Sequence, residues 1–193
     1  MKIGVLALQG AFLDHKKVLE RCGVEVVHVR LPEHLEEVQG IIIPGGESTT
    51  IGKLMIDFGL KGILTEKIEA GMPVFGTCAG MILLAKNIYE TDQPRLGIMD
   101  ITVKRNAFGR QVDSFEAMVN IPVLGNVFPA VFIRAPYIME IEPNVSILAE
   151  FDGKIVMARQ GNILACAFHP ELTNDDRIHQ YFISMIKEVR SYS

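Results

Sequence analysis

The sequence predicts a three-layer α/β fold with a mainly parallel central sheet, helices on both faces, and added antiparallel strands in the second half. Three observations support this prediction. Short, almost wholly apolar runs occur in the first half of the chain, and such runs are typical of strands buried on both faces. Amphipathic stretches separate these runs, and an alternation of strand and helix builds a parallel sheet. From about residue 98 onward, short strand-like segments replace the helical ones.

The first half is expected to contain three helices between its strands. The first covers residues 11–21, where apolar residues are spaced among charged ones and Gly23 follows as a stop. The second begins at Ser48-Thr49, which offers an N-cap, and the third covers residues 79–86. The strands of this half are expected at residues 2–8, 24–29, 40–43 and 72–75.

The second half is expected to form hairpins and meandering strands, some of which extend the central sheet. A helix over about 174–190 closes the chain, because its apolar residues recur at helical spacing from Ile178 to Val189. Repeats and Pro-, Gly- or Ser-rich linkers are absent from the sequence, so residues 1–193 are expected to form one domain. The strand-like segments are 98–105, 114–121, 129–133, 145–150, 154–159 and 162–168.

Charge and hydropathy exclude several kinds of partner. The chain has 19 basic and 23 acidic residues and a net charge of −4, which gives no reason to expect nucleic acid. No apolar stretch approaches the ~18 residues of a membrane span, so a membrane association is not expected. Three cysteines cannot all pair within the chain, and without a signal peptide we expect free thiols in the cytoplasm.

The strongest local signal is the run Gly76-Thr77-Cys78-Ala79-Gly80. It lies between an expected strand and an expected helix, which is the setting of a nucleophile elbow. The helix N-terminus would favour the thiolate of Cys78, and its free N–H groups could hold an oxyanion. The alternative is that Cys78 is a small buried apolar residue, and this alternative is preferred for Cys22 and Cys166.

The second signal is the pair His169 and Glu171, which flank Pro170. A residue before proline is pushed towards extended geometry, in which residues i and i+2 point to the same side. Glu171 could therefore hold the imidazole of His169, and His169 could act as a base towards a thiol. Alone, such a pair is more often a solvated surface feature; with Cys78 it becomes much more specific.

The remaining histidines lack such a companion in the sequence. His15 stands next to Asp14 and is expected on an exposed helix face. Cysteines and histidines do not occur at the spacings that metal sites use, so no metal is expected. These histidines are His15, His28, His34 and His179.

The third signal is Pro44-Gly45-Gly46-Glu47-Ser48-Thr49-Thr50, again at a strand end before a helix. Its glycine N–H groups could face Cys78 and supply half of an oxyanion hole. The pattern of a phosphate-binding P-loop is missing from it. The remaining alternative is a simple tight turn with a helix cap.

Together these motifs resemble the class I, triad-type glutamine amidotransferases, and most closely the glutaminase subunits of pyridoxal phosphate synthase. The resemblance runs from residue 3 to the final helix. Its most specific parts are the Glu-Ser-Thr-Thr after the double glycine and the segment RNAFGRQ. The matching stretches are GIIIPGGESTT (40–50), FGTCAGMILLA (75–85), RNAFGRQVDSFE (105–116), VFIRAP (131–136) and FHPEL (168–172).

The resemblance implies a flavodoxin-like fold and a role for each motif residue. Cys78 would be the nucleophile, His169 the base and Glu171 the residue that orients it. Gly46 and Ala79 would supply the oxyanion N–H groups. The glutamine site would be lined by Gly46, Glu47, Ser48, Arg105, Ile133 and Arg134. Which of Arg105, Arg110 and Arg134 binds the glutamine carboxylate stays open.

The implied activity is hydrolysis of L-glutamine to glutamate and ammonia through a γ-glutamyl thioester. The ammonia would pass to a separate synthase (lyase) subunit in a large hetero-oligomer, and this chain itself would need no cofactor. Three alternatives remain. The chain could be a stand-alone cysteine hydrolase or peptidase of the same superfamily, the glutaminase subunit of another amidotransferase, or a non-catalytic subunit that keeps the fold.

Overall fold

The computed structural model describes residues 1–108 and 113–191 of the chain. Half of its main sheet is parallel, as predicted, with the strand order β2-β1-β3-β4-β12. The short apolar runs form these strands because both faces of the sheet are covered by helices. The strands are β1 (Lys2–Leu6), β2 (Glu25–Val29), β3 (Ile41–Ile43), β4 (Val74–Thr77) and β12 (Ile163–Cys166).

The second half of the chain extends this sheet with antiparallel strands, which confirms the prediction. The order continues β12-β11-β9-β6, and β10 pairs with β11, all antiparallel; the edge strand β5 pairs with β6 in parallel. Strands β7 and β8 form a separate two-stranded ribbon. The bounds are β5 (Ala85–Ile88), β6 (Met99–Lys104), β7 (Ser114–Ile121), β8 (Asn126–Ile133), β9 (Tyr137–Ile141), β10 (Ser146–Phe151) and β11 (Lys154–Gln160).

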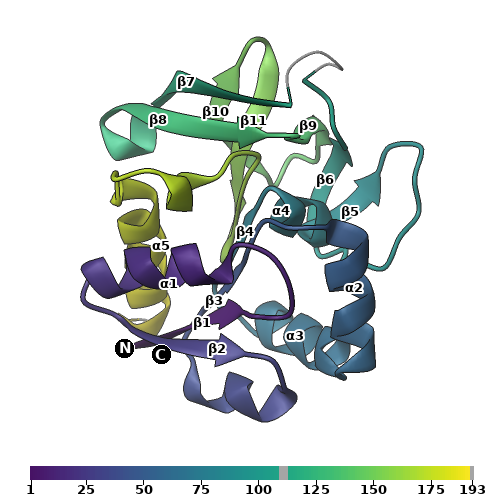
Figure 1. Cartoon of the computed structure of the whole chain (residues 1–193), viewed down its shortest axis with the longest axis vertical. Helices are drawn as coiled ribbons and strands as arrows, with labels where there is room; N and C mark the ends of the chain where they lie inside the picture. The colour runs from purple at the N-terminus through teal and green to yellow at the C-terminus, as the bar shows by residue number, and fades with distance from the viewer. Residues whose placement is uncertain (109–112, 192–193) are drawn as a thin grey trace.

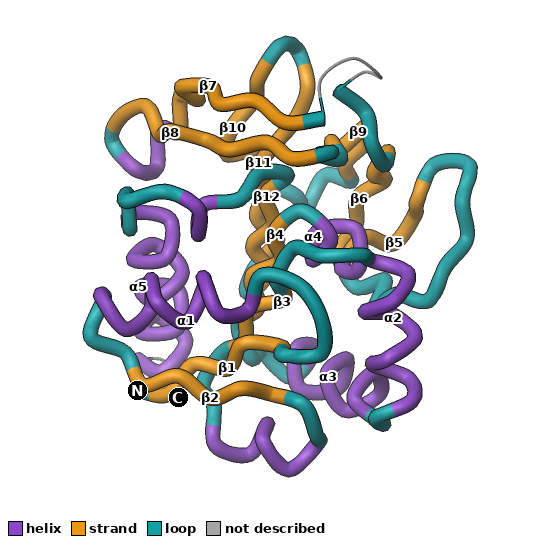
Figure 2. The backbone as a smooth tube through the Cα atoms, viewed as in Figure 1, coloured by secondary structure: helices purple, strands orange, loops and turns teal. Residues whose placement is uncertain are grey.

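Helices cover both faces of the parallel half, so the fold has the expected three layers. Figures 1 and 2 show α1 and α5 on one side of the sheet and α2 and α3 on the other. The α-helices are α1 (Phe12–Arg21), α2 (Ser48–Asp57), α3 (Leu60–Glu69), α4 (Ala79–Leu84) and α5 (Arg177–Ser191). Short 3-10 helices are η1 (Pro32–Glu37), η2 (Pro122–Leu124) and η3 (Pro170–Leu172).

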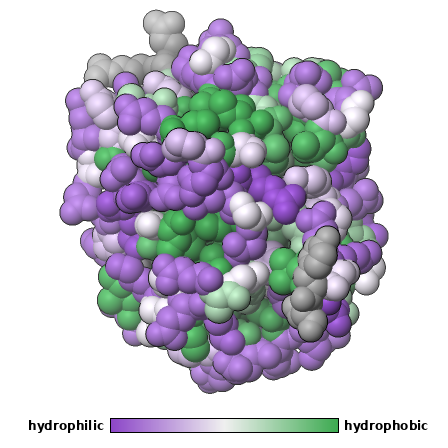
Figure 3. Space-filling view, turned by 180° about the vertical axis from the view of Figure 1, so that it is seen from behind, coloured by the Kyte–Doolittle hydropathy of each residue, from purple (hydrophilic) through white to green (hydrophobic). Residues whose placement is uncertain are grey.

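The core lies between the sheet and these helices. The side chains of Ile41, Ile42 and Ile43 are fully buried, because β3 lies between β1 and β4 and both faces of this part of the sheet are covered. On the surface opposite to the view of Figure 1, hydrophobic areas alternate with broad hydrophilic bands (Figure 3). Within the described residues, no helix has the length and apolar character that a membrane crossing requires.

Several element predictions were wrong in detail. The helix expected over 79–86 ends at Leu84, and the chain continues as β5, which pairs with β6. The predicted N-cap was also wrong: Glu47, not Ser48, caps α2 by accepting bonds from the amides of Thr49 and Thr50. Helix α5 begins three residues later than expected, and β8 begins earlier. Helix α3 and strand β9 were not predicted.

The topology gathers the functional motifs at one edge of the sheet. Gln9 follows β1, Gly46 follows β3, Cys78 follows β4 and His169 follows β12. These strands are parallel neighbours, so their carboxyl ends lie together. This edge is where open α/β sheets bind their ligands.

Candidate active site

Cys78 occupies a strained turn between β4 and α4, as the nucleophile-elbow motif predicts. Its backbone has φ 50° and ψ −104°, a region that a residue with a side chain rarely adopts. The flanking glycines make the turn possible. A Cβ atom on Gly76 would lie 2.6 Å from the backbone of Gly80, and one on Gly80 would lie 2.0 Å from the carbonyl oxygen of Ile43.

The side chains of Cys78, His169 and Glu171 form a line at this edge. The thiol of Cys78 lies beside the His169 ring and donates to the carbonyl oxygen of Ile133 at 3.8 Å, and Nδ1 of His169 lies 2.6 Å from Oε1 of Glu171. Burial lowers the pKa of His169, but the bonds to Cys78 and Glu171 outweigh it and raise this pKa to about 10. His169 therefore carries a proton at neutral pH, placed between a thiol and a carboxylate.

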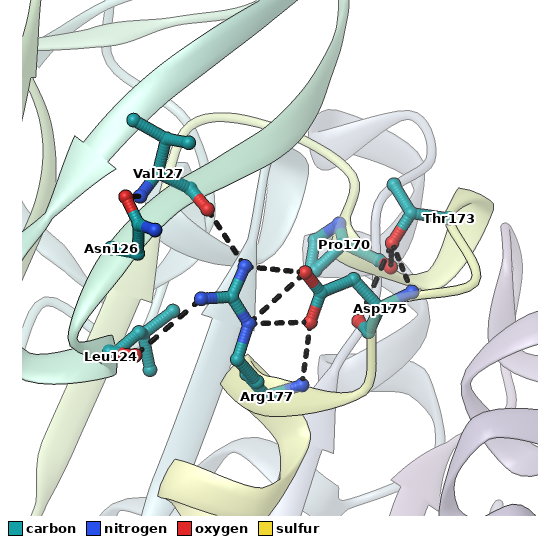
Figure 4. Close-up of polar contacts among 7 residues, drawn as sticks. All are labelled: Leu124, Asn126, Val127, Pro170, Thr173, Asp175 and Arg177. Carbon is teal, nitrogen blue, oxygen red and sulfur yellow. Dashed lines mark hydrogen bonds and ion pairs between the residues drawn. The ribbon is translucent and has the colours of Figure 1, made fainter.

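The segment that carries His169 and Glu171 is tied to the neighbouring elements by Arg177. This guanidinium donates to the Asp175 carboxylate at 2.6 Å and to the carbonyl oxygen of Val127 at 2.7 Å (Figure 4). The Thr173 hydroxyl donates to the carbonyl of Pro170 at 2.9 Å. The turn after His169 is thus connected to β8 and to the start of α5.

Cys78 and His169 open into a cleft of about 350 Å³, which is the volume of a small-molecule site. Every residue predicted to bind glutamine or an oxyanion lines it, and Glu171 lies behind His169. The lining residues are Gln9, Gly46, Glu47, Ser48, Cys78, Ala79, Ile82, Arg105, Asn106, Ile133, Arg134 and His169.

Three lining residues were not predicted as site residues: Gln9, Ile82 and Asn106. The Oε1 atom of Gln9 accepts a bond of 2.8 Å from the Glu47 amide, which connects the ends of β1 and β3. Asn106 belongs to the RNAFGRQ segment, which was a usable signal. Five non-glycine residues in the described part of the chain have positive φ, and Cys78, Asn106 and Arg134 among them line the cleft. Such backbone strain is concentrated at functional sites.

The two arginines of the cleft that the structure describes differ in the hydrogen bonds and ion pairs that they make. Arg105 donates to Oε1 of Gln93 at 2.8 Å and lies 3.7 Å from the Glu47 carboxylate. The guanidinium of Arg134 makes no ion pair or hydrogen bond with any described residue. Arg110, the third candidate for binding a carboxylate, lies outside the described residues.

Glu47 is held as an anion at the mouth of the cleft. The Thr50 hydroxyl donates to its carboxylate at 2.6 Å, and the amides of Thr49 and Thr50 donate as well. These bonds, the Thr50 hydroxyl first, lower the pKa of Glu47 despite its partial burial. The carboxylate can therefore attract a positively charged group of a ligand.

The prediction for His15 was wrong. The side chain of His15 is fully buried, and its ring contacts His179 and Thr77 rather than solvent. Of the other two cysteines, Cys166 is buried as expected, and burial raises the pKa of its thiol well above the ordinary value, whereas Cys22 is only half-buried. Among the described residues, no group of three or more His, Cys, Asp and Glu side chains could hold a metal ion.

The chain is similar to several known proteins. Residues 5–188 match the SNO glutamine amidotransferase family. A protein of Carboxydothermus hydrogenoformans named pyridoxal 5'-phosphate synthase subunit PdxT is 63% identical over 96% of this chain and 98% of that protein. A protein of the same name from Pelotomaculum thermopropionicum is 65% identical over 95% of this chain and 94% of its own length.

Two solved structures are also similar to this chain. A crystal structure described as a glutamine amidotransferase superposes with a TM-score of 0.93 at 49% identity, covering 96% of this chain and 98% of that one. A putative GMP synthase protein of Thermoplasma acidophilum superposes with a TM-score of 0.74 at 19% identity, covering 100% of this chain and 96% of that one. The second match is a likeness of fold alone.

Proposed function

This chain belongs to the SNO glutamine amidotransferase family, and we propose that it is the glutaminase subunit of a pyridoxal 5'-phosphate synthase. The observation that carries the proposal is the line of Cys78, His169 and Glu171 at the wall of a cleft. The names of the two bacterial relatives support the choice of pathway. Residues 1–193 then form a single glutaminase domain.

The reaction requires Cys78 to attack as a thiolate next to the protonated His169 ring. The sulfur attacks the carboxamide carbon of glutamine, and the carbonyl oxygen becomes an oxyanion next to the N–H groups of Gly46 and Ala79. His169 gives its proton to the departing nitrogen, so ammonia leaves and a γ-glutamyl thioester remains.

Water completes the reaction. The neutral His169 ring takes a proton from the water that attacks the thioester, and glutamate leaves as the C–S bond breaks. The proton from the water stays on His169, the sulfur of Cys78 is free again, and the site is ready for another glutamine. Glu171 holds the ring in place through Nδ1, at the 2.6 Å separation described above.

The cleft has groups of opposite charge for the amino-acid end of glutamine. We assign the carboxylate to Arg134, because its guanidinium has no partner among the described residues and Arg105 already contacts Gln93 and Glu47. The Glu47 carboxylate faces the ammonium. A guanidinium binds a carboxylate through two parallel hydrogen bonds, which fixes the direction of the substrate.

The ammonia goes to a separate synthase subunit, which uses it to build pyridoxal 5'-phosphate. A stand-alone cysteine hydrolase with the same three residues is the other candidate. The RNAFGRQ and Glu-Ser-Thr-Thr segments speak against it, since they are the parts that resemble this glutaminase family most specifically.

The deciding experiment measures glutamate release by the purified chain with and without the synthase subunit of its source organism. The proposal expects a rate that rises strongly with the synthase, and pyridoxal phosphate formed from glutamine only in the complex. Full glutaminase activity without the synthase, or none with it, would contradict the proposal.

A further inference from the structure

A fully buried polar cluster lies directly behind Glu171 and takes no part in the steps above. It contains His15 of α1, Thr77 at the end of β4 and His179 of α5. Nδ1 of His15 lies 2.9 Å from Nε2 of His179, and Nε2 of His15 lies 3.1 Å from the Thr77 hydroxyl. The same Nε2 lies 3.5 Å from Oε2 of Glu171, the buried carboxylate oxygen that does not face His169 and that makes no hydrogen bond with any described residue.

Both histidines of the cluster are neutral. Burial lowers the pKa of His15 well below its ordinary value, and the rings of His179 and His169 lower it further. Burial also lowers the pKa of His179 to about 4. Each ring therefore carries one N–H, and the contact between them is a hydrogen bond from one ring to the other.

The surroundings decide which ring donates. If His15 donated through Nδ1, its bare Nε2 would face the Glu171 carboxylate, and Nδ1 of His179 would hold a buried N–H without a partner. If His179 donates through Nε2, only its Nδ1 lone pair is left unpaired, and Nε2–H of His15 points to Thr77 and Glu171. Buried N–H groups without a partner are rarer than under-used acceptors. The second arrangement is therefore the stable one.

We propose that His15 is a positioning residue for the Cys78–His169–Glu171 line: its Nε2–H, shared with Thr77, is the one positive dipole in the described part of the chain that faces the otherwise unbonded second oxygen of Glu171 at 3.5 Å, and His179 fixes the tautomer that makes this possible. Glu171 then lies between two imidazoles, one on each oxygen. The carboxylate cannot rotate away from His169 without losing the second contact. The proposal rests on the proposed glutaminase function for its kinetic consequence, but its tautomer is a property of the chain alone.

The first test is nitrogen NMR of the whole chain labelled with ¹⁵N-histidine, at neutral pH. The signals of His15 and His179 are assigned by their loss in His15→Gln and His179→Gln. We expect a protonated Nε2 and a bare Nδ1 on both rings. A protonated Nδ1 on His15, or a doubly protonated ring, would overturn the proposal whatever the activity of the protein.

The second test compares two variants of His15 in the complex with the synthase subunit. His15→Gln keeps an N–H near the position of Nε2, whereas His15→Leu removes it. For His15→Leu we expect kcat to fall by about 10- to 100-fold with little change in KM, because a misplaced catalytic group costs rate rather than binding. His15→Gln should recover most of kcat. His28→Leu is the matched control, since His28 lies on β2 against Phe12 and should leave kcat unchanged.

Equal loss of kcat in His15→Gln and His15→Leu would overturn the role of the N–H, as would an unchanged kcat in both. If His15→Leu does not fold, a different measurement replaces the kinetic comparison. It is the NMR signal of the proton in the hydrogen bond between His169 and Glu171, recorded in His15→Gln. That resonance should stay close to its wild-type position, and its disappearance would contradict the proposal. If the wild-type complex shows no glutaminase activity, the proposed function fails, while the NMR tests still decide the placement of His15.

Discussion

Gly45 lies so close to His169 that a Cβ atom on Gly45 would fall 2.4 Å from Cε1 of the ring and 3.0 Å from Nδ1. The backbone of the loop after β3 is therefore in contact with the imidazole ring of the residue that follows β12. The position of the ring is also fixed by Glu171, whose Oε1 lies 2.6 Å from Nδ1. A glycine at this position is a condition for the observed place of His169.

The first prediction follows from this contact. Gly45→Ala should displace the His169 ring and lower kcat of the complex by about 100-fold, since small displacements of catalytic groups have effects of this order. Gly62→Ala is the matched control, because a Cβ atom on Gly62 of α3 meets nothing within 4 Å. Both variants should remain folded in a thermal melt. A Gly45→Ala enzyme with wild-type kcat would show that His169 is not confined as described.

The second prediction concerns the nucleophile. Cys78→Ala should lower glutamine hydrolysis by several orders of magnitude. The substitution removes only a sulfur that contacts the His169 ring and the carbonyl oxygen of Ile133, 3.8 Å away, so the fold should persist. Iodoacetamide gives an independent check: in the wild type, Cys78 should react faster than Cys22. More than about a tenth of wild-type activity in Cys78→Ala, or equal labelling of the two cysteines, would refute the assignment.

The third prediction ranks the other two residues. His169→Asn should be about as damaging as Cys78→Ala, because it removes the group that donates and accepts the proton. Glu171→Gln should be less damaging, since Glu171 orients and stabilises the ring without reacting. Initial rates of the three variants in the complex give the order. A Glu171→Gln enzyme slower than Cys78→Ala would reverse the roles assigned here.

The proximity of Cys78, His169 and Glu171 could be predicted because the sequence patterns that arrange them are local. The glycines around Cys78 and the proline between His169 and Glu171 occur within a few positions of the residues that they arrange. The cluster behind Glu171 has no such signal: His15 contacts Thr77, 62 positions away, and His179, 164 positions away. Only the packing of α1 and α5 on the same face of the sheet brings these side chains together.

The missed elements have similar reasons. Helix α3 contains Gly62 and follows Gly59, which obscured the helical spacing of its buried residues Leu60, Leu64 and Ile68. Strand β5 continues a run with helical character, and it is a strand because it pairs with β6. Pairing partners distant in sequence cannot be recognised from a local pattern.

The fourth prediction is a pH dependence of stability. Folding raises the pKa of His169 from 6.5 to about 10. Its protonation therefore stabilises the folded state fully below about pH 6.5, less and less between there and pH 10, and not at all above. Urea midpoints of the wild type and of His169→Asn should differ most near pH 6 and converge as the pH rises through about 10. A difference that grows with rising pH would contradict a raised pKa.

The last prediction concerns activation by the synthase. Because a free glutaminase would release ammonia without an acceptor, we expect its oxyanion hole to be incomplete until the synthase binds. The peptide between Gly45 and Gly46 is the expected switch, because glycines can rotate a peptide unit at little steric cost. The carbonyl oxygen of Gly45 accepts a bond of 3.0 Å from the Ala11 amide, which ties this peptide to the start of α1. Contacts of the synthase near Gln9 and α1 would therefore reach the loop.

One missing oxyanion donor is worth about 10²- to 10³-fold in rate, so the isolated chain should be nearly inactive and the synthase should raise kcat rather than only lower KM. Gly46→Val should abolish the stimulated activity, because a Cβ atom there would lie 2.4 Å from Oε1 of Gln9 and 3.0 Å from Cα of Gly10. Gly62→Ala again serves as the control. Steady-state glutamate release with and without the synthase gives both constants. Equal kcat in the two conditions would exclude the switch, yet it would leave the roles of Cys78, His169 and Glu171 standing, since these depend on the side chains and not on the rotation of the loop.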